Sequence, residues 1–242
     1  MRGEMAGGAA GRQSRDKNRR EAFLEAARRL FFDSGYRGTS IQQIAAEAGY
    51  SKRAVYLDYQ NKDELFISVC AEGLALLLAK LREVPWQEIT VESCVARFLE
   101  VYIDFSRDHP EEFRMIFSEA TPAIIANCSP PIRSRVAELE RQCLEVVVRL
   151  IERAVREGIL QEIDPWEAAG IIVGSATGII LLSMGGSQTV FSRETLESLV
   201  TRAIWTLWRG LKPEGSGLAR PANRRGHDRS ASHLPRSARA HP

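Results

Sequence analysis

Apolar residues recur every third or fourth position along most of this chain, which is the spacing of one face of a helix. The pattern is clear over residues 20–32, where Gly35 marks the end of the helix, and it returns over 91–105 and 131–158. Another helix is expected to start at Asp164, because a capping acid precedes a first-turn proline there. No segment alternates apolar and polar residues as a half-buried strand does. The predicted fold class is therefore all-α.

The most specific local signals lie in residues 39–65. Ser40 is placed to cap a helix while Gln43 reaches back to it, which is the capping-box pattern. Gly49 stands where a positive φ ends that helix, and Ser51 is placed to cap the next one. The segment therefore predicts two short helices joined by a tight turn and followed by the start of a third helix.

The second of these short helices has an outward face that suits a nucleic acid. Lys52, Arg53 and Tyr56 share this face, while Val55 turns back toward the first helix. Lysine and arginine read guanine edges in the major groove, and a tyrosine reaches phosphate or a base. Lys62, in the first turn of the third helix, adds a candidate phosphate contact. A purely structural helix-turn-helix is the alternative, but the placement of the cations and caps favours DNA binding.

Together with the helix before them, these segments resemble the DNA-binding domain of the tetracycline-repressor-like (TetR) family. The shared motifs are an A-A-x-x-L-F helix, a G-x-x-x-T-S entry, an I-A-x-x-A-G-x-S turn and an N-K-x-x-L-F start of the third helix. The resemblance covers residues 17–77 and implies a helix-turn-helix over 40–59 that binds a double-stranded DNA operator. The predicted DNA contacts are Thr39, Ser40, Gln42, Ser51, Lys52, Arg53, Tyr56, Tyr59 and Lys62.

Two residues depart from the family pattern. Asp58 stands where members usually carry a histidine, and phosphates repel an aspartate unless it accepts from a cytosine amine or pairs with Arg53. This departure leaves the operator sequence open, and it keeps a second hypothesis alive, a ligand-binding or protein-interaction module that has lost DNA affinity. Tyr50 replaces a valine after the turn and is expected to be a bulkier core residue.

Composition divides the chain into segments. Lys and Arg outnumber Asp and Glu by 12 to 9 in residues 1–65 and by 7 to 2 in 211–242, whereas residues 66–210 hold 14 basic and 20 acidic side chains. Such asymmetry suits a protein that brings one face to a polyanion. The predicted segments are a disordered leader (1–16), the DNA-binding domain (17–77), a helical ligand-binding and dimerisation domain (78–210) and a disordered basic tail (211–242).

Candidate chemistry elsewhere is sparse. The four cysteines form no C-x-x-C pair, which favours a reducing cytoplasm. Cys128 and Cys143 are either redox-sensing thiols or small packing residues, and packing is favoured. The histidines have no metal-ligand spacing, so neither a metal nor a cofactor is expected. An enzyme on a helical bundle is disfavoured because the chain lacks nucleophile-elbow, phosphate-loop and E-x-x-H motifs.

Residues 168–192 contain no charged side chain, so a membrane span must be weighed against a packed interface helix. The strongly apolar part is short and lacks a positive flank, which favours the interface helix and no membrane association. The family resemblance implies that the last two helices of each subunit pair in a four-helix bundle, so a homodimer is predicted. The predicted interface residues are Gly170, Gly174, Gly178, Leu196, Val200 and Ile204.

The resemblance also implies a small-molecule effector that enters the core of residues 85–190 and alters the spacing of the recognition helices. A repressor is expected, with an activator as the alternative. Apolar stripes on several helices predict a largely apolar ligand, although the same stripes are equally typical of a plain core. The helix over 61–82 is expected to be the one link between the two domains. The candidate pocket residues are Phe98, Tyr102, Phe113 and Cys143.

Overall fold

The computed structural model describes residues 5–118, 121–184 and 193–213. These residues form ten helices and no strand, which confirms the all-α prediction. The helices are α1 (Met5–Gly38), α2 (Ile41–Glu47), α3 (Lys52–Asp58), α4 (Lys62–Arg82), α5 (Val91–Asp108), α6 (Pro110–Ile116), α7 (Thr121–Ala126), α8 (Pro130–Arg156), α9 (Pro165–Met184) and α10 (Arg193–Gly210).

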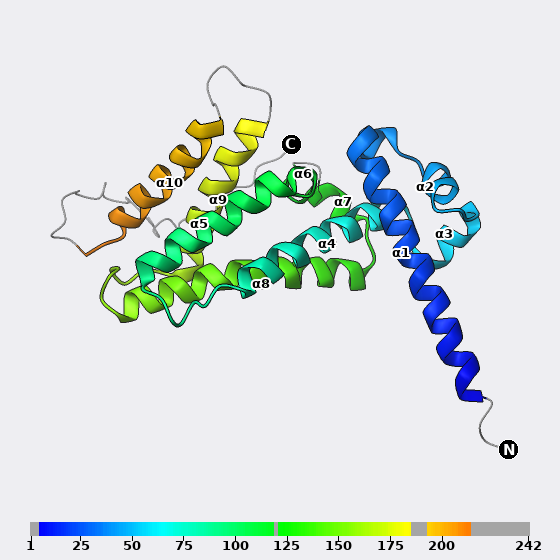
Figure 1. The fold of residues 1–242 in the computed structure, drawn as a ribbon, viewed down its shortest axis with the longest axis horizontal. Coiled ribbons are helices and arrows are strands. Elements are labelled where there is room, and N and C mark those ends of the chain that lie inside the picture. Colours follow the sequence, from blue (N-terminus) through cyan, green and yellow to red (C-terminus); the bar gives the residue numbers. More distant parts are fainter. Residues whose placement is uncertain (1–4, 119–120, 185–192, 214–242) are drawn as a thin grey trace, which may run out of the picture.

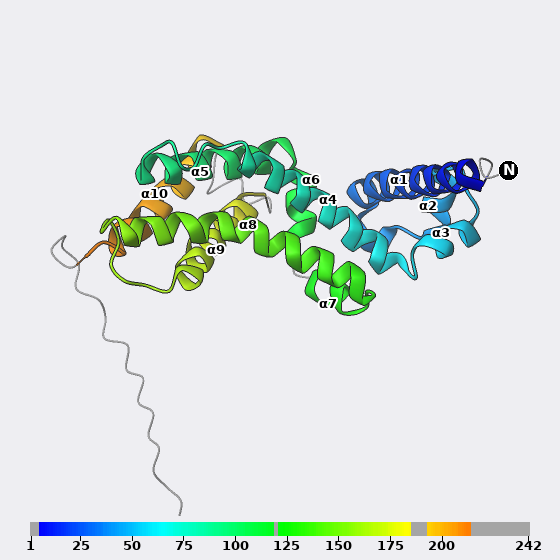
Figure 2. The same cartoon turned by 90° about the horizontal axis from the view of Figure 1, so that it is seen from below.

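Helices α1 to α3 form a small unit at one end of an elongated molecule, and α4 runs from this unit into a larger helical body (Figure 1). In the body α4 lies against α8, α5 packs on both, and α6 packs on α4 and α5 (Figure 2). Helices α9 and α10 pack against each other, and α9 also packs on α8. The first half of α1 extends beyond α2 and α3, away from the body (Figure 1).

Local capping signals define the start of each helix in the small unit. The Ser40 hydroxyl accepts from the Gln43 amide while the Gln43 side chain accepts from the Ser40 amide, so the predicted capping box is present. Ser51 and Asn61 accept from amides in the first turns of α3 and α4 in the same way. Gly49 has a φ of 75°, which a residue with a Cβ rarely adopts, and this conformation turns α2 sharply into α3.

Two predictions from the sequence need correction. The leader was expected to be disordered to residue 16, but α1 begins at Met5 and continues through it. The short helix α7 was not anticipated, because Thr121 and Pro122 interrupt the apolar spacing that marks the other helices.

Helix α9 is the one helix in the described segments that is long and apolar enough to cross a membrane, judged by length and composition alone. Ala168, Ile172, Ala176 and Ile180 recur every four residues and are buried within the protein. Core helices of soluble proteins pass the same test. The buried stripe therefore fits a helix that packs as part of the body.

Candidate nucleic-acid interface

Helix α3 presents a polar and cationic face to solvent. Val55 and Ile44 are fully buried between α2 and α3, which fixes the rotation of α3. Lys52, Arg53 and Tyr56 consequently point outward and are exposed, as the sequence predicts for this face. The Lys52 ammonium lies 5.9 Å from the centre of the Tyr56 ring, so the two side chains form one continuous surface.

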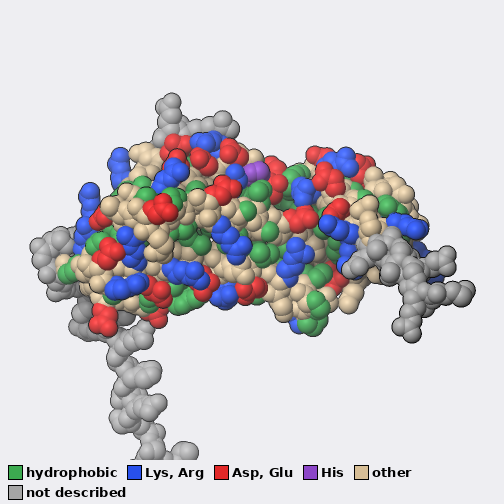
Figure 3. Space-filling view, turned by 60° about the horizontal axis from the view of Figure 1, so that its bottom comes forward, with side chains coloured by type: hydrophobic (Ala, Val, Ile, Leu, Met, Phe, Trp, Pro, Cys, Tyr) green, Lys and Arg blue, Asp and Glu red, His purple; other side chains and the backbone are tan. Residues whose placement is uncertain are grey.

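The two cations of α3 have no acidic partner among the described residues. Most arginines elsewhere in the described chain are paired; Arg97, for example, binds Glu100 at 2.5 Å and Arg141 binds Glu138 at 2.7 Å. Acidic and basic side chains are intermixed over the body in the same way (Figure 3). Lys52 and Arg53 therefore keep their charge available for a polyanion.

Three other predicted contacts lie at the surface near α3. Ser40, Gln42 and Ser51 are exposed at the starts of α2 and α3. The hydroxyls of Ser40 and Ser51 cap their helices, but both remain open to solvent on one side. These side chains and the outward face of α3 form one surface.

Two predicted contacts lie in the interior instead. The Thr39 side chain is buried, and its hydroxyl donates to the carbonyls of Leu30 and Gly35 at 3.0 and 2.9 Å. Tyr59 follows the last residue of α3 and is also buried, and this burial raises its pKa to about 12. Both residues therefore belong to the core that supports α3 and not to its outward surface.

Lys62 is engaged within the protein. Its ammonium donates to the carbonyls of Tyr36 and Thr39 at 2.7 and 2.9 Å, and it lies 4.0 Å from the centre of the Tyr36 ring. Lysine has three N–H donors, so at most one remains for a phosphate. The position predicted to clamp DNA instead ties the end of α1 to the start of α4.

Asp58 does not meet either expected partner. Its side chain is 3% exposed and pairs with Arg19 at 2.7 Å and with Arg20 at 3.0 Å, both on α1, rather than with Arg53. Burial by itself raises the pKa of Asp58, but hydrogen bonds from the two guanidinium groups outweigh it and lower the pKa below its usual value. The carboxylate is charged and directed into the protein, so it is not presented to phosphates.

Two apolar side chains near α3 face solvent, and the sequence did not assign either to this surface. Tyr50 was expected in the core but is 42% exposed, with its ring edge against Phe23. Leu57 is 69% exposed on α3 beside Tyr56. Apolar side chains at this position are suited to contact a thymine methyl group. Residue 57 falls outside the motifs that carry the family resemblance, so the sequence gave no signal for it.

Two family models match this chain. The model described as bacterial regulatory proteins of the tetR family matches residues 23–69, and the model described as the tetracyclin repressor-like C-terminal domain matches residues 95–207. The chain belongs to the TetR family. It is therefore a helix-turn-helix, DNA-binding transcriptional regulator, and the family is not one of enzymes.

Relatives of this TetR-family protein are distant in sequence. The uncharacterized regulator YhgD of Bacillus subtilis is 24% identical over 148 residues, which are 61% of this chain and 75% of YhgD. The regulator RutR of Escherichia coli is 26% identical over 150 residues, which span 61% of this chain and 66% of RutR. The solved structure of AibR in complex with isovaleryl coenzyme A and operator DNA has a TM-score of 0.58 at 24% identity, covering 78% of this chain and 98% of AibR. That likeness shows a shared fold.

A polar junction joins the TetR-type DNA-binding unit to the body. The buried Glu64 carboxylate accepts from the amide of Gln60 at 2.7 Å and from the amide of Ser129, which precedes α8, at 2.9 Å. Beside it the Asn127 side chain donates to Asp63 at 2.8 Å. The α7–α8 loop therefore holds the start of α4, the helix that runs between the two parts.

The predicted pocket residues pack closely within the body. Phe98, Tyr102 and Phe113 are at most 3% exposed and pack on one another, with ring centres 5.5 and 5.6 Å apart. The Tyr102 hydroxyl is 2.6 Å from that of Thr177 on α9. Cys143 is half-buried and its thiol donates to the Leu74 carbonyl at 3.7 Å. These four residues form part of the core.

A crevice of about 240 Å³ lies elsewhere, where the end of α4, the α4–α5 turn and α8 meet. Its walls include Trp86, Glu145 and three arginines, of which Arg149 pairs with Glu145 at 3.7 Å, Arg153 pairs with Glu157 at 2.7 Å, and Arg82 has no acidic partner among the described residues. Arg153 also donates to the carbonyls of Trp86 and Ile89 at 2.8 and 2.9 Å, so it fixes the turn. The crevice is thus cationic on one side and aromatic on another.

The cysteines favour packing over redox chemistry. Burial raises the pKa of Cys128 to about 11 and that of Cys143 to about 12. Thiols with such pKa values stay protonated at neutral pH, and the thiolate is the reactive form. These positions are therefore suited to packing.

We predict that Lys62→Ala lowers the free energy of unfolding by about 1–3 kcal/mol, because two buried carbonyls lose a charged donor. The salt dependence of DNA binding should stay as in the wild type, since this ammonium is already engaged. Chemical denaturation and binding titrations at several salt concentrations measure the two quantities. A salt slope reduced by about one would instead show that Lys62 contacts a phosphate.

We predict that Glu64→Gln destabilises the protein by about 1–3 kcal/mol near pH 7, because an amide cannot accept at both oxygen positions. Burial raises the pKa of Glu64, but hydrogen bonds from Ser129 and Gln60 lower it below the usual glutamate value. The carboxylate thus stabilises the fold above about pH 4.3, and this contribution is lost as the pH falls through the lowered pKa.

The difference in unfolding free energy between this variant and the wild type should therefore shrink as the solution is acidified. The Glu152→Gln variant, at an exposed position within α8, is the matched control and should unfold like the wild type at each pH. An equal difference at neutral and acid pH would show that the charge of Glu64 does not stabilise the junction.

Proposed function

We propose that this regulator is a dimeric repressor that leaves a palindromic operator when a small effector binds its helical body. The observation that carries the DNA-facing part is the outward surface of α3, where Lys52, Arg53 and Tyr56 are exposed and the cations are unpaired within the described chain. The inward direction of Asp58 removes the main argument for a module without DNA affinity. The expected compartment is the cytoplasm, where a bacterial regulator meets its operator.

We predict that Lys52→Ala and Arg53→Ala each cost about 1–3 kcal/mol of operator affinity and relax the preference at one base pair. The operator is first recovered by selecting genomic fragments that the wild type binds, and affinities are then measured on single-base variants. The exposed Arg97→Gln variant on α5 is the control, since it lies on the body outside the proposed DNA and dimer contacts. Unchanged affinity and unchanged base preference in both α3 variants would refute the assignment.

The outer face of α9 supports a homodimer. Gly170, Gly174 and Gly178 are exposed in the single chain, and a Cβ at any of them would meet no atom within 4 Å. Ile171 and Leu182 beside them are exposed large apolar side chains. A second copy that covers this face would bury apolar surface and allow close helix contact.

The residues of α10 that were predicted to lie at the dimer interface differ in how deeply they are buried. Val200 and Ile204 are fully buried inside the protomer, whereas Leu196 is half-buried. Val200 and Ile204 therefore hold α10 in the body, and we remove them from the proposed interface. The proposed contact surface is the glycine face of α9 together with the partly exposed side of α10.

We predict that Gly174→Leu yields a monomer with weak operator binding, because four added carbon atoms on each copy separate the helices. Light scattering on the purified variant measures the mass. Gly210→Leu makes the same change at the exposed end of α10, where a Cβ also meets nothing within 4 Å, and should remain dimeric. A dimeric Gly174→Leu variant with normal operator affinity would place the interface elsewhere.

For the effector, the cationic and aromatic crevice supports a small molecule with an apolar or planar part and an anionic group. Arg82 has no acidic partner among the described residues and is placed to attract the anion; Arg149, which also pairs with Glu145, lines the same crevice, and Trp86 offers a stacking surface. AibR, which shares the fold, binds isovaleryl coenzyme A, a molecule that combines an apolar acyl group with phosphates. Because α4 lines the crevice at one end and carries Glu64 at the other, effector binding is transmitted through α4 and the junction with the α7–α8 loop.

We predict that isovaleryl coenzyme A binds the dimer more weakly when operator is present, by the same factor by which it weakens DNA binding, typically about 5–150-fold. Arg149→Gln should weaken effector binding about tenfold through loss of a charge-assisted contact, while Arg97→Gln should not. Calorimetric titrations with and without operator measure both effects. Equal affinities in the two conditions would refute the coupling and leave DNA binding untouched.

A further inference from the structure

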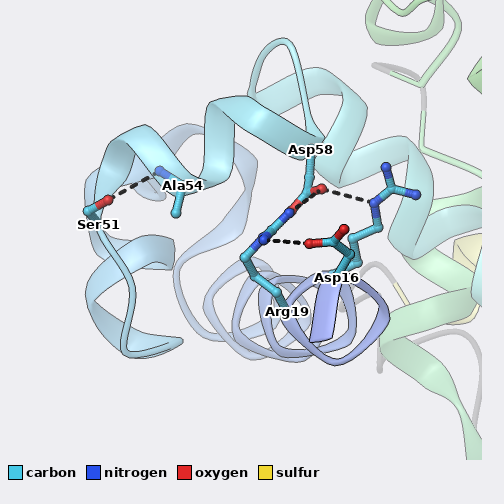
Figure 4. Close-up of polar contacts among 6 residues, drawn as sticks. Asp16, Arg19, Ser51, Ala54 and Asp58 are labelled. Carbon is cyan, nitrogen blue, oxygen red and sulfur yellow. Dashed lines mark hydrogen bonds and ion pairs between the residues drawn. The ribbon is translucent and has the colours of Figure 1, made fainter. Parts of the chain in front are cut away.

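Asp58 occupies an electrostatically unfavourable place. It is the last residue of α3, where the helix dipole is negative, and its side chain is almost fully buried. Arg19 compensates with two hydrogen bonds, from Nε at 2.7 Å and from Nη2 at 3.0 Å, one to each carboxylate oxygen (Figure 4). Arg20 adds a third from its Nε at 3.0 Å. One carboxylate thus engages two arginines from another helix.

This arrangement has a consequence for DNA binding. Arg20 remains 60% exposed and stands beside the C-terminal end of α3, so it lies near the DNA backbone if α3 occupies a major groove. A free arginine there would bind phosphate whatever the sequence, because phosphate contacts carry no base information. Bound to Asp58, its guanidinium group and that of Arg19 are already engaged by an anion within the protein.

We propose that Asp58 determines specificity by holding Arg19 and Arg20 away from phosphates, so that DNA affinity depends on the outward face of α3. The same bidentate contact fixes the angle between α3 and α1, which positions Lys52 and Arg53. The inference rests on the proposed DNA-facing role of α3. Asp58 is in this sense a positioning residue that touches no base.

The test is the salt dependence of binding to a mixed-sequence duplex of about 30 base pairs, long enough for two half-sites one helical turn apart. Asp58→Asn should bind this duplex more tightly than the wild type, and the slope of log affinity against log salt should steepen by about 0.9 for each arginine released. The ratio of operator to mixed-sequence affinity should fall. An unchanged or shallower slope overturns the proposal, including the case in which only thermal stability falls.

Two controls separate the charge effect from a structural one. Asp16→Asn removes a carboxylate 2.9 Å from Arg19 but leaves the contacts to Asp58, so its salt slope should match the wild type. Adding Arg19→Gln and Arg20→Gln to Asp58→Asn should return the steepened slope to the wild-type value. A slope that stays steep in the triple variant would mean that other cations cause it, which overturns the proposal.

Arg20→Gln in the otherwise wild-type chain decides the matter even if Asp58→Asn fails to fold. The proposal expects an unchanged salt slope, because Arg20 already binds Asp58. A slope reduced by about 0.9 would show that Arg20 contacts phosphate in the wild type and would overturn the proposal.

If Lys52→Ala and Arg53→Ala leave DNA binding unchanged, the proposed role of α3 fails. If they weaken it and Asp58→Asn keeps the wild-type slope, only the inference about Asp58 fails.

Discussion

The burial of α4 on almost every side holds the two parts of the protein together. Phe66 packs edge-on against Phe31 of α1, whereas Leu77 and Leu81 lie toward the other end of α4, and all three α4 residues are at most 4% exposed. Burying each such side chain is worth about 1.5–3 kcal/mol, so neither end of α4 separates easily from its neighbours. One continuous apolar cluster runs through both parts. The boundary placed at residue 77 therefore falls inside a shared helix and a shared core.

Two polar contacts around this shared core fix how α3 and α4 are oriented against their neighbours. The junction of Glu64 with Ser129 fixes the start of α4 against the body, and the pair of Asp58 with Arg19 fixes the end of α3 against α1. Each is a buried carboxylate, and a buried charge is costly to leave unpaired. Each contact therefore holds its two segments in one relative position. Between these two contacts lies the short segment that joins α3 to α4.

Sequence predicted the local features of this arrangement well and its long-range contacts poorly. Capping by Ser40, Ser51 and Asn61 needs partners only three residues away, so the pattern itself contains the whole interaction. Asp58 and Arg19 are separated by 39 positions, and Glu64 and Ser129 by 65. Nothing in the spacing of residues reveals such a pair. Lys62 and Asp58 have other partners than the sequence predicted, because those partners come from segments far away in the chain.

Apolar periodicity has a related limit, which α9 illustrates. Nearly every position in this helix is apolar or small, so the sequence pattern does not indicate which side of α9 faces the body. Ile172, Ala176 and Ile180 fill the interior, and the side with Gly170 and Gly174 is left bare in the single chain. A bare apolar side on a helix that is buried on its other side is poorly solvated, and a second copy offers an equally apolar surface. The same reasoning separates Phe98 and Tyr102, which neighbouring rings already cover, from the arginine-lined crevice, which still has room for a ligand.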